Sequence, residues 1–260
     1  MRQFWKVCAV AAGMAVVGVC RAAPDDYMVV DLSKGVAGPY TISYTNAPPE
    51  GGWTDAHKTS LLVLRRIPRA TFIMGSPTNE TGRIADGRED QREVTISNDY
   101  YVGVFEITEG QCKRLLNVGS ADSVLPAEFD EDVLRIDAVL NKLKGTHTND
   151  FAIPNEAQWE YACRAGSAEA YCFGSEVGLL PAYAWYQANA GGNKQRVGLK
   201  TPNAFGLYDM HGNMDEVVER LGGGGRWLCG GRYSRSAERC RSAERYNYST
   251  VSMGLRLCLE

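Results

Sequence analysis

Cysteine is the residue type in this sequence with the widest chemistry. Beyond the first 23 residues there are six cysteines: Cys112, Cys163, Cys172, Cys229, Cys240 and Cys258. Their thiolates could bind a soft metal, act as nucleophiles or form disulfides. No two are spaced as C-x-x-C, which disfavours a zinc ribbon or a thioredoxin-like redox pair. Six thiols can pair in many ways, so spacing alone leaves the disulfides open.

The other residues that often carry catalysis form no familiar motif. His57, His147 and His211 are far apart in the sequence, and a three-histidine metal site would need all of them to converge. There is no phosphate-binding loop ending in Gly-Lys-Ser/Thr, no H-E-x-x-H and no G-x-S-x-G. The run Gly222–Gly225 is followed by no phosphate-binding residue, and we interpret it as a flexible turn.

The N-terminus predicts export. Residues 1–23 begin with basic side chains, continue with the apolar run 7–20 and end in two alanines, which is the pattern of a secretory signal peptide. The run is shorter than the ~20 residues that span a bilayer, and no later segment is apolar enough to do so. A lipid anchor on Cys20 is the alternative, but Val19 is bulkier than the residue that usually precedes such a cysteine. We therefore expect a secreted or periplasmic protein, in a compartment where disulfides form.

Composition and charge narrow the class of protein. The 260 residues are 44% hydrophobic and 23% charged, as in an ordinary globular domain. Loss of residues 1–23 would remove three positive charges and leave 25 basic against 31 acidic residues, a net charge of −6. Such a chain has no basic field to attract nucleic acid, so we expect no nucleic-acid partner.

Periodicity and capping residues predict a mixed architecture. Short β-prone runs lie at residues 61–64, 71–75 and 100–105, and helical patterns at 109–117 and 130–144. A third helix should begin at Asn155, which has Gln158 three residues later, and end before Gly166. Beyond Ala170 regular signals are sparse. We expect an α+β fold with much irregular chain, divided into an N-terminal strand and loop extension at 24–64 and a main domain at 65–260.

Five segments, in order along the chain, resemble hallmarks of one enzyme family. They are Thr71–Ser76, Tyr101–Thr108, Ile153–Arg164, Pro202–Asn213 and a C-terminal group of Gly230-Gly231, Cys240–Ala243 and Gly254–Arg256. They are similar to the motifs of the formylglycine-generating enzyme, or sulfatase-modifying factor, family. The resemblance implies a compact α+β fold related to C-type lectins.

The best-known members of that family oxidise a sulfatase cysteine to formylglycine with molecular oxygen and copper(I). Two thiolates hold the copper, as expected for a soft ion. The resemblance places this pair between Gly231 and Cys240, but residues 232–239 contain no cysteine. We therefore expect no copper site and a non-catalytic binding or structural module whose ligand is an unidentified protein or glycan. The alternative is a copper-dependent oxidase in which a distant cysteine such as Cys229 supplies the missing ligand.

The resemblance also implies one disulfide. Cys240 matches a family cysteine that is bonded to the helix cysteine matched by Cys163, although Cys240 can also be aligned with one member of the copper pair. For the other four cysteines, pairing of Cys172 with Cys229 and of Cys112 with Cys258 is our working interpretation.

A structural calcium site is the last expectation drawn from the family. The family loop binds calcium through a side-chain oxygen at the position of Asp209, the carbonyls of Gly212 and Met214, and the carboxylate of Glu216. Oxygen ligands in a tight loop suit this hard cation. The sequence Gly212–Val217 lacks the two tryptophans usual in the family but keeps the glutamate. In the alternative interpretation the acidic side chains of the loop face solvent.

Overall fold

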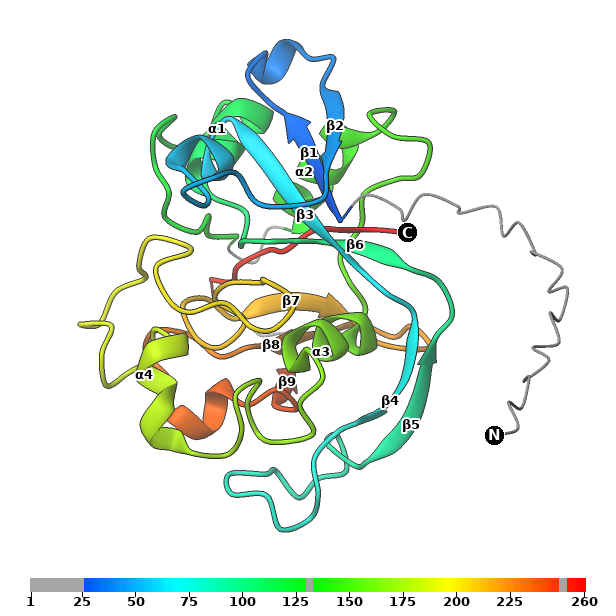
Figure 1. Ribbon diagram of the computed structural model, residues 1–260, viewed down its shortest axis with the longest axis vertical. Coiled ribbons are helices and arrows are strands. Elements are labelled where there is room, and N and C mark those ends of the chain that lie inside the picture. The colour runs from blue at the N-terminus through cyan, green and yellow to red at the C-terminus, as the bar shows by residue number, and fades with distance from the viewer. Residues whose placement is uncertain (1–25, 130–132, 248–251) are drawn as a thin grey trace, which may run out of the picture.

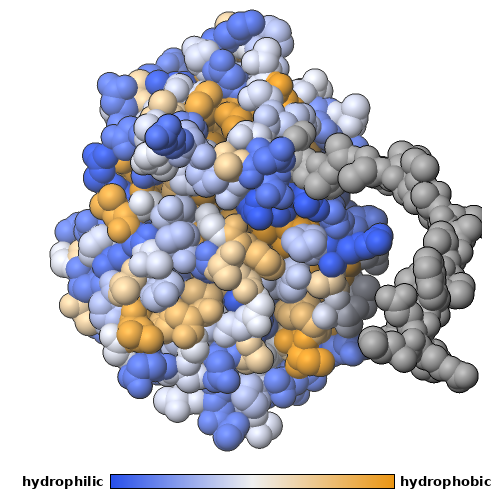
Figure 2. All heavy atoms as spheres, viewed as in Figure 1, coloured by the Kyte–Doolittle hydropathy of each residue, from blue (hydrophilic) through white to orange (hydrophobic). Residues whose placement is uncertain are grey.

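The computed structural model describes residues 26–129, 133–247 and 252–260 (Figure 1). The predicted signal peptide, residues 1–23, lies outside the described residues. In the described part of the chain, no helix has the length and apolar character needed to cross a membrane. Figure 2 shows hydrophilic residues over most of one face, with small separate groups of hydrophobic ones between them.

The largest sheet joins strands from both ends of the chain. Its order is β10-β6-β3-β1-β2, and every neighbouring pair is antiparallel. The strands are β1 (Tyr27–Asp31), β2 (Thr41–Thr45), β3 (Leu61–Ile67), β6 (Tyr100–Gly103) and β10 (Cys258–Leu259). Val29 of β1 lies opposite both Ser43 and Val63. The predicted N-terminal extension thus supplies β1, next to the central strand β3, and β2 at the edge of the main sheet.

Two smaller sheets lie in the lower half of the molecule as drawn in Figure 1. One is the hairpin of β4 (Ala70–Met74) and β5 (Arg92–Ile96), which continues the chain from β3. The other consists of β7 (Glu216–Glu219), β8 (Arg226–Cys229) and β9 (Arg245–Asn247) in that order.

The helices begin where the capping residues predict. Thr108 caps α1 (Glu109–Leu116) and forms a capping box with Gln111. Asn155 caps α3 (Glu156–Arg164) in the same way, and the left-handed Ala165 ends that helix just before Gly166. The other helices are α2 (Val133–Leu143) and the single turn α4 (Leu180–Tyr183), with 3-10 turns at Gly35–Ala37, Asp55–Lys58, Val177–Leu179 and Ala237–Cys240.

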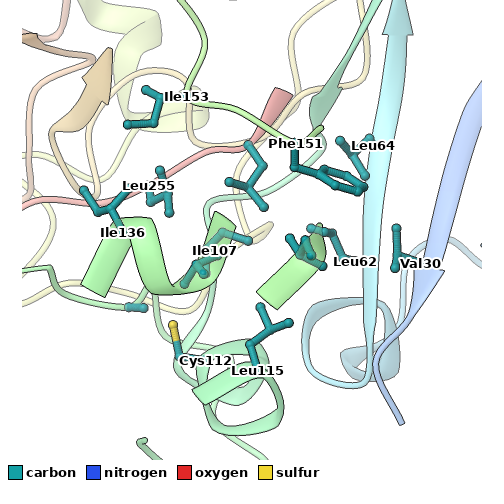
Figure 3. Close-up of a cluster of buried hydrophobic side chains, with 14 of the residues drawn as sticks. Val30, Leu62, Leu64, Ile107, Cys112, Leu115, Ile136, Phe151, Ile153 and Leu255 are labelled. Atoms are coloured by element: carbon teal, nitrogen blue, oxygen red, sulfur yellow. The ribbon is translucent and has the colours of Figure 1, made fainter. Parts of the chain in front are cut away.

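The main apolar core lies between the five-stranded sheet and helices α1 and α2. Figure 3 shows Val30, Leu62 and Leu64 from the strands facing Leu115 of α1 and Ile136 of α2. All of these side chains are buried. A second core surrounds the buried indole of Trp159 on α3. The predicted α+β class is confirmed, and the region between α3 and β7 contains only one short α-helix and one 3-10 turn, as the sparse signals indicate.

Candidate functional site

The four residues predicted to bind calcium lie in the loop that precedes β7 and at the first position of that strand. Three of its residues have left-handed backbone: Asp209 (φ 56°), Gly212 (φ 81°) and Asn213 (φ 61°). A Cβ atom on Gly212 would lie 2.1 Å from the carbonyl oxygen of Trp185, so only glycine fits there. The Gly212 N–H donates to the Gly230 carbonyl at 2.7 Å, which ties the loop to the end of β8.

Glu216, at the start of β7, is the acceptor of a buried ion pair. Arg256 donates to both of its carboxylate oxygens at 2.6–3.1 Å, and Trp159 Nε1 donates to Oε2 at 2.7 Å. The remaining N–H groups of Arg256 bind the carbonyls of Gly103 and Tyr208. Both charged side chains are fully buried. This network joins α3, β6 and the C-terminal segment. Because the carboxylate and the guanidinium group are fully hydrogen-bonded, the protein can tolerate burying both charges.

Glu106 also hydrogen-bonds to this loop, and the sequence analysis did not identify it as a candidate site residue. Its two oxygens accept from Asn213 Nδ2 at 2.6 Å and from the Met214 N–H at 3.0 Å. Burial and the nearby charges of Asp209 and Glu216 raise the pKa of Glu106 well above its usual value. Glu106 therefore holds the loop within an acid-rich surrounding.

Asp209 is the predicted calcium ligand with an available oxygen. Its Oδ2 accepts from the Gly198 N–H at 2.6 Å, whereas Oδ1 is buried without a hydrogen-bond partner among the described residues. Burial raises the pKa of Asp209 to about 6. Of the two predicted carboxylate ligands, Glu216 is engaged by Arg256, so only Asp209 offers an orphaned oxygen to a cation. Within the described residues, no three His, Cys, Asp or Glu side chains converge as a metal site. The calcium site stays a prediction.

Cys163 and Cys240, the pair that the family implies, both contact His211, and all six described cysteines are free thiols in the structure. Cys163 Sγ lies 3.7 Å from Ser242 Oγ and 3.9 Å from both ring nitrogens of His211. Cys240 Sγ lies 3.7 Å from the Ser236 carbonyl oxygen. His211 connects the segments, because its ring meets the Cys240 carbonyl oxygen at 2.7 Å and the Cys172 N–H at 3.1 Å. The Cys163–Cys240 disulfide, which the structure does not contain, stays a prediction, as do the other two pairings.

The described thiols are largely shielded from solvent. Five of the six are buried and Cys172 is half-buried. Desolvation raises the pKa of Cys112 and Cys172 to about 12, and it also raises the pKa values of the other four thiols. Copper(I) binds thiolates, and two must face one accessible position. The burial of the described thiols therefore disfavours the copper site that the family implies, and its absence stays an expectation.

A polar cluster occupies the segment where the family places its copper ligands. Asp215, at a tryptophan position of the family motif, is fully buried. Its carboxylate lies 3.8 Å from Arg232 Nε. Burial raises the pKa of Asp215, although the positive charges of Arg232 and Arg235 act in the opposite direction. Arg235 also lies over the ring of Tyr246, 5.0 Å from its centre. The substitution of aspartate for tryptophan was visible in the sequence, but its partners were not.

A surface pocket lies between three irregular segments of the chain. It has a volume of about 320 Å³ and is lined by the loop after β4, the chain after α3 and the 3-10 turn before Arg241. Arg241 is buried at its base and donates to Glu80 at 2.5 Å and to Glu89 at 2.8 Å. The guanidinium charge of Arg241 is thus balanced by the carboxylates of Glu80 and Glu89 and is not left for a ligand.

Comparison with known proteins agrees with this fold. The profile of the sulfatase-modifying factor enzyme 1-like domain family matches residues 127–259, slightly more than half of the chain. The chain belongs to this family. A comparison with curated protein sequences finds no match.

Solved structures share the fold. Treponema denticola variable protein 1 is 21% identical with a TM-score of 0.64, and the alignment covers 76% of this chain and 95% of that one. PvdO from Pseudomonas aeruginosa is 23% identical with a TM-score of 0.63, covering 80% and 97%. CarF is 16% identical with a TM-score of 0.51, covering 75% and 96%. At these identities the likeness shows the fold alone.

Proposed function

We propose that the mature chain is an exported, non-catalytic binding module of this family. One observation carries the proposal: residues 232–239 contain no cysteine, and the thiol of Cys240 that follows them is buried in the core. A copper(I) oxidase needs two thiolates beside an accessible reaction site.

The same segment supplies the binding surface. Arg232 lies over the ring of Tyr233, 5.0 Å from its centre, as Arg235 does over Tyr246, and all four side chains are partly exposed. Guanidinium groups and phenol rings are frequent in recognition surfaces, because they combine flat apolar area with hydrogen-bond donors. The buried carboxylate of Asp215 lies behind them. The ligand we propose is a protein or a glycan.

The catalytic alternative has a direct test. The mature protein would be incubated with copper(I), oxygen and a peptide containing Cys-x-Pro-x-Arg, and the products analysed by mass spectrometry, with an active oxidase of the family as positive control. We expect no aldehyde from this protein. Conversion of the peptide would contradict the proposal and favour copper-dependent formylglycine formation.

The binding surface has a test of its own. The mature protein would be applied to a glycan array and to candidate exported proteins. We expect binding to be lost in the double variant Arg232→Ala/Arg235→Ala and kept in Arg196→Ala, whose side chain is exposed and paired with Asp55 elsewhere on the surface. Equal binding by both variants would exclude this surface.

Export is part of the proposal and rests on the N-terminal sequence. N-terminal sequencing of the secreted or periplasmic protein should begin at Pro24. A mature protein that begins with a lipid-modified Cys20 would show the lipoprotein alternative instead.

Calcium binding is proposed as a structural role through the loop before β7. Asp209 Oδ1 and the carbonyls of Gly212 and Met214 would hold the ion and stiffen the loop, and Glu216 would join them by releasing one oxygen from Arg256. Calcium added to chelator-treated protein should raise its melting temperature, and Asp209→Asn should abolish the increase. An unchanged melting temperature in the unaltered protein would contradict this role.

A further inference from the structure

The strand β2 forms an open edge of the main sheet. It pairs with β1 on one side, and among the described residues no strand pairs with its other side. Its side chains are exposed or half-buried, and Tyr44 is 43% exposed. In a strand every second residue directs its N–H and C=O groups to the outer edge, so this edge offers backbone donors and acceptors to another strand.

The opposite edge of the same sheet is covered. Strand β10 has two residues, and Cys258 exchanges both backbone hydrogen bonds with Ala152 on its outer side at 2.8 and 2.9 Å. Both β10 residues are buried. Among the described residues, one edge of the sheet is thus paired and the other is open.

The open edge lacks the features that usually prevent strand addition. Proteins protect edges with charged side chains, with proline inside the strand or with bulges. No charged residue occurs between Lys34 and Glu50, and the strand sequence Thr-Ile-Ser-Tyr-Thr consists mostly of β-branched and aromatic residues without proline. Its register with β1 is unbroken over all five residues.

We propose that β2 pairs antiparallel with β2 of a second copy of this chain. The strand is self-complementary about Ser43: a two-fold register places Ser43 opposite Ser43, Thr41 opposite Thr45 and Ile42 opposite Tyr44. One face of the paired strands then carries only hydroxyl side chains, and the other carries two pairs of isoleucine and tyrosine, a favourable cross-strand combination. An isologous contact of this kind closes as a dimer.

The charge distribution favours a second copy over a charged partner. The mature chain has a net charge of −6, yet the edge has no charge at all, so like charges do not face each other across the pairing. The resulting dimer joins the two main sheets into one continuous sheet. Because one five-residue strand gives a small interface, the dimer should dissociate on dilution.

Symmetric cross-linking tests the register. Mild oxidation of Ser43→Cys should give a covalent dimer, since two copies of position 43 face each other. The control Thr41→Cys should give much less, because its partner across the dimer is Thr45, and the unaltered protein, whose described cysteines are buried or half-buried, should give little. Equal cross-linking of the two variants would overturn the proposed register.

Sedimentation tests the association itself. The unaltered protein should shift from one chain toward two as its concentration rises from about 1 to about 100 µM, the range in which small interfaces associate. Ser43→Lys should stay a monomer, because it places two ammonium groups opposite each other, while Ser43→Thr should associate as the unaltered protein does. A monomer at every concentration, or a dimer unaffected by Ser43→Lys, would overturn the proposal. Neither result bears on the proposed binding surface, which uses other residues.

Discussion

The two halves of the molecule are stabilised by different means. Between the five-stranded sheet and helices α1 and α2, the buried side chains are almost all apolar. Around α3 and the C-terminal segment the core contains charged side chains that are nearly or fully buried, among them Glu106, Glu160, Asp209, Glu216, Arg241, Arg245 and Arg256. Apolar packing is tolerant and non-directional, whereas each buried charge needs its own partner at a fixed place. The first half is therefore a packed layer, and the second is a set of loops held by specific pairs.

The largest effect should come from breaking a buried pair. Arg256→Ala would leave the Glu216 carboxylate without its cation and two carbonyl groups without donors. We expect a loss of about 3–5 kcal/mol in the free energy of unfolding, measured by urea denaturation. The double variant Glu216→Gln/Arg256→Met removes both charges and should be less destabilised than Arg256→Ala. If Arg256→Ala is more stable than the double variant, the pairing of Glu216 with Arg256 does not stabilise this half of the molecule.

A cavity in the apolar half should be nearly as costly. Leu64 of β3 is fully buried in the main core, and Leu64→Ala should cost about 2–5 kcal/mol by the same measurement. The matched variant Leu64→Met conserves volume and should cost less than about 1.5 kcal/mol. Similar losses in both variants would show that position 64 is sensitive to shape rather than to volume.

Acid should weaken the loop half through His211. Burial lowers the pKa of His211 to about 4 from its usual 6.5, so the folded protein keeps the ring neutral while the unfolded chain is protonated below pH 6.5. The stability contributed by this group is complete above pH 6.5 and is lost as pH falls toward 4. Between pH 7 and pH 5 the loss should be about 2 kcal/mol. His211→Gln should show a smaller loss over this interval, and an identical pH dependence in both proteins would contradict the assignment.

The smallest expected effect is on thiol reactivity. Because burial raises the pKa of every described thiol, iodoacetamide at pH 8 should modify the native protein at least about ten-fold more slowly than a free cysteine. Cys172, the half-buried thiol, should react first. Peptide mapping without reduction would show whether Cys163 and Cys240 are joined by a disulfide. Fast labelling of a second thiol would indicate an accessible pair and reopen the copper hypothesis.

The sequence predicted what depends on local rules. The caps Thr108 and Asn155 begin α1 and α3 because a side chain within three residues satisfies the first N–H groups of the helix. The family could be predicted from ordered motifs. Glu216 was singled out, but not its pairing with Arg256, since that contact joins residues 40 positions apart and leaves no periodic pattern. Glu106 was missed for the same reason, because its partners lie more than 100 positions away.

The main sheet joins segments from both ends of the chain, which limits when it can form during folding. Strand β6 hydrogen-bonds to β3 on one side and to the final strand β10 on the other, so the last three residues complete a sheet that begins at residue 27. Ile107 and Gly103 likewise donate their N–H groups to carbonyls of residues 255 and 257. Long-range pairing of this kind delays folding until distant segments meet. The main sheet therefore cannot be completed before residues 255–259 have been synthesised.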